Sequence, residues 1–410
     1  VEVLRGPQGT LYGRNATGGS INLISNPPVE EFGAQIEGQL GDYDQQRLRG
    51  FLNMPLIDQK LLMRVSGQYQ ERDGYYENKT PGADDLTDED SVNLRGQFLY
   101  MPTGDFDALL NVNYSTQKGA GYGVKALGPY PEPPGLVPAL LVDATPNPDD
   151  EWDIRTNGIA DRDNERQGAY LTINWDLGAV ALKSISAWQE NDVDTLRDVD
   201  LSDADIFNET SQQDSTQYSQ ELHLTSTGTG PWEWLVGLYY LNEETDADFW
   251  YTDMGAGLSS YPFFPTIDVG LPYETYFGNR STTEVDSFGA FGQASYLISD
   301  DLNLTAGLRY SKDEKESDIF RKEFLAQEGV NFKKDDDWDH VTWKLGADWF
   351  VTEESMLYAS VSTGFKSGGF LQTVGSEPYD EETIIAYEIG SKNRFFENRL
   401  QANVSAYYYE

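Results

Sequence analysis

The sequence predicts an all-β protein, a transmembrane antiparallel β-barrel, on three observations. Fifteen stretches of about ten residues alternate apolar with polar side chains, and the connections between them alternate between short and long. The longest nearly apolar run, Leu136 to Val142, is interrupted by Pro138 and is too short for a spanning helix. Inside a bilayer every backbone N–H and C=O group must be bonded within the protein, so such a chain can cross only as a closed sheet.

The alternation assigns a face to each side chain, because successive residues of a strand point to opposite sides. In residues 61–70, Leu61, Val65 and Tyr69 belong to the face expected to meet lipid, whereas Arg64 and Gln68 belong to the lumen face. The same pattern returns in residues 302–311 and 400–409, and no helical period fits these runs. A soluble sandwich or propeller is the alternative, since its strands also alternate.

The connections favour the barrel. The short turns are expected at Pro55–Lys60, Met101–Phe106, Leu177–Ala179, Ser226–Trp232, Ser299–Leu302, Val351–Ser355 and Asn393–Arg399. The intervening connections are expected at Gly41–Gln46, Arg72–Asp90, Lys118–Glu165, Asn191–Asp214, Glu243–Thr283, Lys312–Asp339 and Lys366–Glu382. Outer-membrane barrels sort their connections in this way, with short periplasmic turns and long extracellular loops.

Composition agrees with this location. The 410 residues hold 29 basic and 69 acidic side chains, a net charge of −40, which would repel nucleic acid. Aromatic residues make up 13% of the chain, and Tyr and Trp suit the bilayer interface. The absence of cysteine excludes disulfides, thiolate metal sites and cysteine nucleophiles within these residues. We expect an internal fragment, because the chain starts at Val1 without a signal peptide and stops at Glu410 within an alternating stretch.

Residues 1–28 differ from the rest, being rich in glycine and turn-forming residues. The string VEVLRGPQGTLYGRNATGGSINLISNPP resembles the end of the plug domain of TonB-dependent outer-membrane receptors, which has the form LRGPxGxLYGxxxxGGxINxI. The motif positions include Gly6, Pro7, Tyr12, Gly13, Gly18 and Gly19. We interpret these glycines as turn and close-packing positions. A phosphate-binding loop is the alternative, but GRNATGGS lacks the lysine and the following helix that such a loop needs.

A second resemblance lies near the other end of the chain. LYASVSTGFKSGGF, at 357–370, and the segment at 379–410 are similar to barrel segments of the same family. The resemblance implies a plugged barrel of the 22-stranded class, with about 15 strands present. Residues 1–30 are then the C-terminal part of the plug domain, and residues 31–410 are a partial barrel that lacks its C-terminal strands.

The resemblance also implies a function. Members of this family are monomers of the Gram-negative outer membrane, surrounded by lipid and lipopolysaccharide, and they take up scarce nutrients by energy-coupled transport. The ligand binds to extracellular loops and plug, and an inner-membrane TonB-type complex pulls on the plug to release it. A ferric siderophore or other iron complex is the leading ligand class; cobalamin and glycans are the alternatives, and no cofactor is expected.

One ion pair is expected between plug and barrel. In residues 383–392, Glu388 is expected to face the lumen, because Ile385, Tyr387 and Ile389 form the lipid face. The family pairs the arginine of its RGP motif with the glutamate of its YExG motif, and Arg5 and Glu388 occupy those positions here. The alternative is that Glu388 contacts only water in the lumen.

Aromatic side chains in the long loops are candidate ligand contacts, since rings can stack on a planar siderophore or a sugar. The alternative is that they pack the loops against each other. The candidates are Tyr122, Tyr130, Trp152, Trp250, Tyr251, Tyr261, Phe263 and Phe264.

No metal site and no catalytic site is expected. Acidic runs at Asp335–Asp337 and at Asp161 and Asp163 contain oxygen ligands that suit Ca²⁺, but a solvated acidic surface is the favoured interpretation. His223 is expected to face the lumen and His340 to lie at a strand start, which supports neither a haem clamp nor a catalytic triad. A passive diffusion porin is the second functional class and an outer-membrane hydrolase the third. The plug-like string separates a receptor from an open pore.

Overall fold

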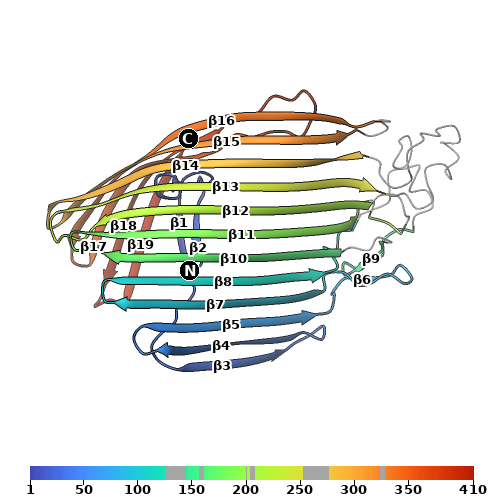
Figure 1. Cartoon of the computed structure of the whole chain (residues 1–410), viewed down its shortest axis with the longest axis horizontal. Coiled ribbons are helices and arrows are strands. Elements are labelled where there is room, and N and C mark those ends of the chain that lie inside the picture. The colour runs from blue at the N-terminus through green and yellow to red at the C-terminus, as the bar shows by residue number, and fades with distance from the viewer. Residues whose placement is uncertain (126–144, 157–160, 200, 204–207, 253–276, 324–327) are drawn as a thin grey trace.

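The computed structural model describes the whole chain except residues 126–144, 157–160, 200, 204–207, 253–276 and 324–327 (Figure 1). Its main element is one antiparallel sheet of 15 strands, in which neighbours along the chain are neighbours in space. The sheet curls, so that β17, β18 and β19 lie behind the strands in the centre of Figure 1. The strands are β3 (Gly33–Leu40), β4 (Gln46–Ile57), β5 (Leu61–Arg72), β7 (Glu89–Thr103), β8 (Phe106–Gly119), β10 (Asp161–Asp176), β11 (Val180–Asp198), β12 (Asn208–Ser226), β13 (Trp232–Thr252), β14 (Phe277–Ser299), β15 (Leu302–Lys322), β16 (Val330–Thr352), β17 (Ser355–Lys366), β18 (Glu382–Phe395) and β19 (Leu400–Tyr409).

The predicted alternation of short and long connections is confirmed. The connections that follow β4, β7, β10, β12, β14, β16 and β18 are tight turns at one end of the sheet. The other connections lie at the opposite end, where the small strands β6 (Glu77–Asn78) and β9 (Asp153–Ile154) are found (Figure 1). One end of the sheet therefore has only tight turns, and the other end carries the loops.

The two predicted faces of the sheet are also confirmed. On β15, Leu308 is 58% exposed on the outer face, while Arg309 on the inner face is 4% exposed. On β5, Val65 is 42% exposed and its neighbour on the chain Arg64 lies on the other side, next to the ring of Phe51. Among the described residues no helix is long and apolar enough to span a membrane.

Several strands are longer than the sequence predicts. The expected loops Asn191–Asp214, Glu243–Thr283 and Lys312–Asp339 begin and end inside β11 to β16, which run on as a regular ladder. These extensions carry polar side chains on both faces, for example Lys333, whose ammonium lies 2.7 Å from a carboxylate oxygen of Asp318 on the adjacent strand. Water can solvate both faces of a strand beyond the bilayer, so apolar alternation ends before the hydrogen-bonded ladder does.

The first residues form a separate small unit. Strand β1 (Glu2–Arg5) pairs with β2 (Gly19–Asn22) in an antiparallel hairpin, and the short helix α1 (Gly9–Tyr12) lies between them in sequence. We call residues 1–22 the N-terminal unit. Helix α1 lies against β14, β15, β16 and β17. The unit therefore occupies the concave side of the curved sheet (Figure 1).

Candidate functional site

The N-terminal unit packs closely on the inner wall because its contact residues are small. A Cβ atom on Gly9 would lie only 2.9 Å from Thr342 Cγ2 and from the carbonyl oxygen of Thr363. The methyl group of Thr10 fills the space in front of Gly307 in the same way. The backbone N–H of Asn15 donates a 3.0 Å hydrogen bond to the carbonyl oxygen of Phe365. Backbone therefore meets backbone across this contact.

Arg309 of β15 lies at the centre of the contact. Its guanidinium is held between Gly289 of the wall and Gly13 of the N-terminal unit, where a Cβ would lie 2.8 Å from Arg309 Nη2. The guanidinium carbon lies 4.9 Å from the ring centre of Phe291, and Nε donates a 2.9 Å hydrogen bond to Ser311 Oγ. Gly13 has φ +79°, a conformation that side-chain-bearing residues rarely adopt. Only glycine satisfies both requirements at this position.

One ion pair joins the N-terminal unit to the wall. Arg14 Nη1 lies 3.4 Å from Asp313 Oδ1, with side-chain exposures of 21% and 0%. The other carboxylate oxygen of Asp313 has no hydrogen-bond partner among the described residues. A buried carboxylate needs a compensating cation, so Arg14 stabilises both Asp313 and the docked unit.

Arg5 and Glu388, the expected ion pair, are not joined in this structure. The side chain of Glu388 accepts a 2.6 Å hydrogen bond from the hydroxyl of Tyr358, and Arg5 is exposed. The two regions nevertheless approach each other. Gly6, the residue after Arg5, has the hydroxyl of Tyr409 as its nearest neighbour, and Tyr409 stacks on Tyr407, which pairs with Glu388 across the strands.

The other motif residues take structural positions. Gly6 and Gly19 have φ of +73° and +140°, and a Cβ on Gly19 would overlap the carbonyl oxygen of Leu4. Pro7 packs against Gly364, and the hydroxyl of Tyr12 accepts a 2.9 Å hydrogen bond from Asn22. A Cβ on Gly18 would meet no atom within 4 Å. Close packing and backbone conformation therefore account for this motif except at Gly18.

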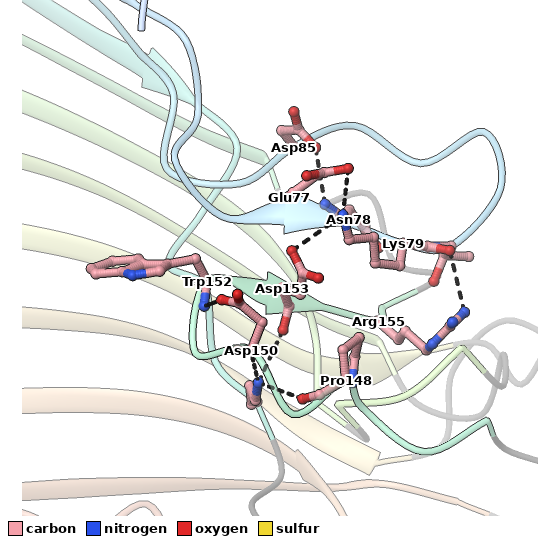
Figure 2. A network of polar contacts seen from close by, with 11 residues as sticks. Glu77, Asn78, Lys79, Asp85, Pro148, Asp150, Trp152, Asp153 and Arg155 are labelled. Atoms are coloured by element: carbon pink, nitrogen blue, oxygen red, sulfur yellow. Dashed lines mark hydrogen bonds and ion pairs between the residues drawn. The ribbon is translucent and has the colours of Figure 1, made fainter. Parts of the chain in front are cut away.

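At the loop end of the sheet, the loop between β5 and β7 is joined to the loop between β8 and β10. Strands β6 and β9 pair in parallel, and Lys79 binds both Glu77 at 2.5 Å and Asp153 at 3.2 Å (Figure 2). Asn78 is buried and its amide donates a 3.0 Å hydrogen bond to the carbonyl oxygen of Thr156. The ammonium of Lys125 donates to the carbonyl oxygens of Pro148, Asp150 and Asp153 at 2.5–3.1 Å. These contacts hold the described parts of the two loops together.

Aromatic side chains cover this loop pair. The ring of Trp152 lies 5.8 Å from that of Tyr75 and 5.5 Å from that of Tyr76, and Arg72 lies over Tyr75. Trp152 is nevertheless 50% exposed. Trp152, a predicted candidate, therefore lies in a cluster with Tyr75 and Tyr76, which the sequence does not single out. Half of the surface of Trp152 is available to a ligand.

The remaining described candidates lie either in the same β8–β10 connection as Trp152 or at the end of β13. Tyr122 is 77% exposed and receives Arg162 on its ring face. Trp250 and Tyr251 lie at the end of β13, and Tyr251 stacks on Phe277 with ring centres 4.4 Å apart. Tyr130, Tyr261, Phe263 and Phe264 lie outside the described residues. The described candidates therefore do not gather at one point.

The acidic runs and histidines take positions that differ in part from those predicted. Asp335–Asp337 and Asp161 and Asp163 lie within strands β16 and β10, where Lys118 contacts Asp163. His340 lies in the middle of β16, not at a strand start, and its ring stacks on Phe365 and contacts Glu381 at 2.8 Å. His223 contacts Glu221 at 2.5 Å. Among the described residues no three His, Asp or Glu side chains gather as a metal site would require.

Comparison with known proteins decides the family. The family model described as "TonB dependent receptor-like, beta-barrel" matches residues 79–410. The chain belongs to the TonB-dependent receptors. It is therefore a protein of the Gram-negative outer membrane.

Curated relatives and solved structures agree with this assignment. The pesticin receptor of Yersinia pestis is 25% identical over 98% of this chain and 54% of its own length. The ferric-pyoverdine 358 receptor of Pseudomonas putida is 24% identical over 99% of this chain and 48% of its own length. The ferric yersiniabactin uptake receptor of Yersinia pestis has the same fold, with a TM-score of 0.81, 20% identity, and coverage of 99% of this chain and 58% of that one. The chain spans about half the length of the curated relatives it matches.

Sequence reasoning missed the residues that hold the TonB-dependent receptor's N-terminal unit on the wall. The alternation places Arg309 on the expected lumen face and Asp313 in an expected loop, and it indicates no partner for either. A signal for them exists, because an arginine and an aspartate in a lumen-facing register of β15 each require compensation. The partner itself, Arg14, follows only from three-dimensional proximity.

Proposed function

We propose that this TonB-dependent receptor takes up a ferric siderophore or another iron complex by energy-coupled transport. Residues 1–30 are, in this proposal, the C-terminal part of a plug domain, and residues 31–410 are part of the barrel around it. A TonB-type inner-membrane complex pulls on the plug and opens the lumen. The name of one relative supports iron as cargo, since that protein is a receptor for ferric pyoverdine.

One observation carries the proposal: a folded N-terminal unit is docked on the inner wall of the sheet through Gly13, Arg14 and Asn15. A passive diffusion porin needs an open lumen and has no use for such a unit. An occluding unit must move before a solute can pass, and this movement requires work. An energised partner on the inner membrane supplies that work.

The contact between the N-terminal unit and the inner wall of the sheet is both specific and reversible. It uses one backbone hydrogen bond from Asn15, one partly exposed ion pair from Arg14 and close packing at glycine positions. In the moving receptor, Arg5 and Glu388 form a second ion pair that holds the plug in register. The approach of Gly6 to Tyr409 supports this pairing, because Tyr409 lies on the strand beside that of Glu388.

The extracellular ligand surface includes the loop pair around Trp152. The paired strands β6 and β9 and the cation Lys79 present Trp152, Tyr75 and Tyr76 as a preformed aromatic cluster. Preformed clusters bind at a lower cost in conformational entropy than mobile loops do. Planar catecholate or heteroaromatic iron complexes fit such a surface by stacking.

Uptake of radioactive iron by cells that express the full-length receptor tests the proposal. We expect accumulation from iron-siderophore mixtures that stops when the proton gradient is collapsed. Accumulation that continues without the gradient would establish a passive pore. Gradient-dependent uptake of cobalamin or of an oligosaccharide, with no uptake of iron, would overturn the assignment of cargo and leave the mechanism intact.

A further inference from the structure

A group of polar side chains lies on the outer face of β11 and β12, where apolar residues are expected. Ser184 and Ser186 are successive residues on that face of β11, and Gln220 stands opposite Ser186 on β12. We call these three residues the polar cluster. The hydroxyl of Ser186 donates a 2.6 Å hydrogen bond to Gln220 Oε1, and Gln220 Nε2 donates a 3.0 Å hydrogen bond to Ser184 Oγ.

Apolar side chains that face outward surround the polar cluster. Leu171 of β10, Leu222 of β12 and Tyr240 of β13 stand directly opposite its members, and all three are exposed. The hydroxyl of Tyr240 donates a 2.7 Å hydrogen bond to Asp286 Oδ1, which marks the level where the apolar surface gives way to a polar one. The polar cluster therefore lies within the lipid-facing surface, close to its edge. Polar side chains in that setting are costly and mark a functional site by default.

A hollow of about 380 Å³ opens beside the polar cluster, and we call it the outer hollow. Ser186 and Gln220 line it, together with apolar and aromatic side chains that include Leu110, Ala169, Leu171, Tyr218 and Tyr240. Among the described residues, the hydroxyl of Ser184 accepts a hydrogen bond from Gln220 and donates to no acceptor. The outer hollow therefore combines an apolar surface with an unused hydrogen-bond donor at its edge.

Carboxylates gather on the outer face beyond the outer hollow. Glu190 and Asp192 are the outward-facing residues of β11 that follow the hollow. Asp192 stands opposite Glu165 of β10 on one side and Asp214 of β12 on the other. In the described part of the chain none of these four carboxylates forms an ion pair with a lysine or arginine. Like charges that stand opposite each other in a sheet repel, so this surface favours a cation from outside the chain.

We propose that the outer hollow binds a membrane lipid with an amide-linked, hydroxylated acyl chain and an ammonium in its headgroup. The hydrocarbon part of the chain contacts the apolar lining. The amide and the hydroxyl near the head of the chain form hydrogen bonds with the polar cluster, which satisfies polar groups that hydrocarbon cannot. The ammonium is attracted by the carboxylates beyond the hollow. This site lies on the outer face, so it is separate from the proposed path of the cargo.

Other occupants fit only part of this surface. Lipopolysaccharide has amide-linked, hydroxylated chains, but Glu190 and Asp192 repel its phosphates. Phosphatidylethanolamine has an ammonium, but its ester-linked chains donate no hydrogen bond to the polar cluster. A second copy of this chain would bring carboxylates against carboxylates, and a folded chain cannot enter a space of about 380 Å³. The aminolipid matches both the hydrogen bonds and the charge.

Lipid binding to the purified, delipidated full-length receptor tests the proposal by native mass spectrometry. The three probes are an ornithine lipid, phosphatidylethanolamine and rough lipopolysaccharide, each without divalent cations. The ornithine lipid has the amide-linked, hydroxylated chain and the ammonium, and each of the other two lacks one of these features. We expect the ornithine lipid to bind about 5- to 30-fold more tightly than phosphatidylethanolamine, because two hydrogen bonds distinguish them.

Variants assign the preference to its causes. Ser184→Ala with Ser186→Ala should bring the ornithine lipid to the affinity of phosphatidylethanolamine. Ser295→Ala with Thr305→Ala is the matched control, since it removes a 2.9 Å hydrogen bond between two hydroxyls on the inner face, and it should leave the preference unchanged. Asp192→Asn should weaken binding of the ornithine lipid and strengthen binding of lipopolysaccharide.

Three results overturn the proposal. The first is equal binding of the ornithine lipid and phosphatidylethanolamine by the unsubstituted receptor. The second is a preference for the ornithine lipid that survives removal of both serine hydroxyls. The third is tighter binding of lipopolysaccharide than of the ornithine lipid, which shows that the carboxylates do not select the headgroup.

Discussion

Removing the cation of the Arg14–Asp313 pair gives a quantitative test of how the N-terminal unit is held. Stripping one partner from a buried ion pair costs about 3–5 kcal/mol. Arg14 is 21% exposed, and its 3.4 Å separation from Asp313 is long for a charged hydrogen bond, so water screens part of the interaction. We therefore expect Arg14→Ala to destabilise docking by about 1.5–3 kcal/mol, which is about 10- to 150-fold in the docking equilibrium.

Amide hydrogen exchange of the full-length receptor measures this change. The N–H of Asn15 donates to Phe365 of the wall, so its protection reports undocking. We expect protection of Asn15 to fall about 10- to 150-fold in Arg14→Ala. Lys118→Ala, which removes an exposed pair with Asp163 on β10, is the control and should leave Asn15 unchanged.

A second variant tests the physical cause. In Arg14→Ala with Asp313→Asn the buried charge is gone as well, so the double variant should recover part of the protection. Full protection of Asn15 in Arg14→Ala alone would refute the reasoning, since the ion pair would then contribute nothing to docking.

Three further predictions concern other contacts. Gly13→Ala should weaken docking by about 1–3 kcal/mol, because its φ is +79° and its Cβ would meet Arg309 at 2.8 Å; exchange at Asn15 measures it, and unchanged protection would contradict it. Asn78→Ala should leave the Thr156 carbonyl without its donor, at a cost of about 1–3 kcal/mol, and speed proteolysis of the loop between β5 and β7; an unchanged cleavage rate would show that the loop pair is held by other contacts. Burial raises the pKa of Asp88, so its ionised form is disfavoured in the folded loop, and the resulting destabilisation is absent below the ordinary pKa of aspartate and present above the raised value. Asp88→Asn should therefore slow loop proteolysis at neutral pH, with the difference from the unsubstituted receptor disappearing as the pH falls toward about 4; a difference that does not depend on pH would contradict this cause.

The fold could be predicted from the sequence because the lipid-facing part of each strand follows a strict period of two. Leu308 and Val65 lie outside, as that period requires. The strand ends could not be predicted in the same way. Beyond the bilayer, Lys333 and Asp318 lie on paired strands and face water. In the sequence, polar segments of this kind have the pattern expected of loops.

The site could be predicted only in part. The motif glycines mark close backbone approach, and Gly9 and Gly13 do meet the wall. Their partners could not be named, because Thr342, Arg309 and Asp313 are brought to them by the register and curvature of strands far along the chain. The pairing of Arg5 with Glu388 stays a prediction, and charge reversal at Arg5 should raise antibiotic leakage through the purified full-length receptor.

A disulfide between the N-terminal unit and the wall tests the central claim most directly. A Cβ on Gly307 would lie 2.7 Å from the methyl group of Thr10, which is within reach of a disulfide after Thr10→Cys and Gly307→Cys. Leu308→Cys replaces Gly307→Cys in the control, because Leu308 points outward and is 58% exposed. We predict that the Thr10–Gly307 variant cross-links, that the control does not, and that cross-linked receptor takes up iron only after reduction. Failure to cross-link, or full uptake by the cross-linked receptor, would contradict a lumen closed by a docked unit that must move.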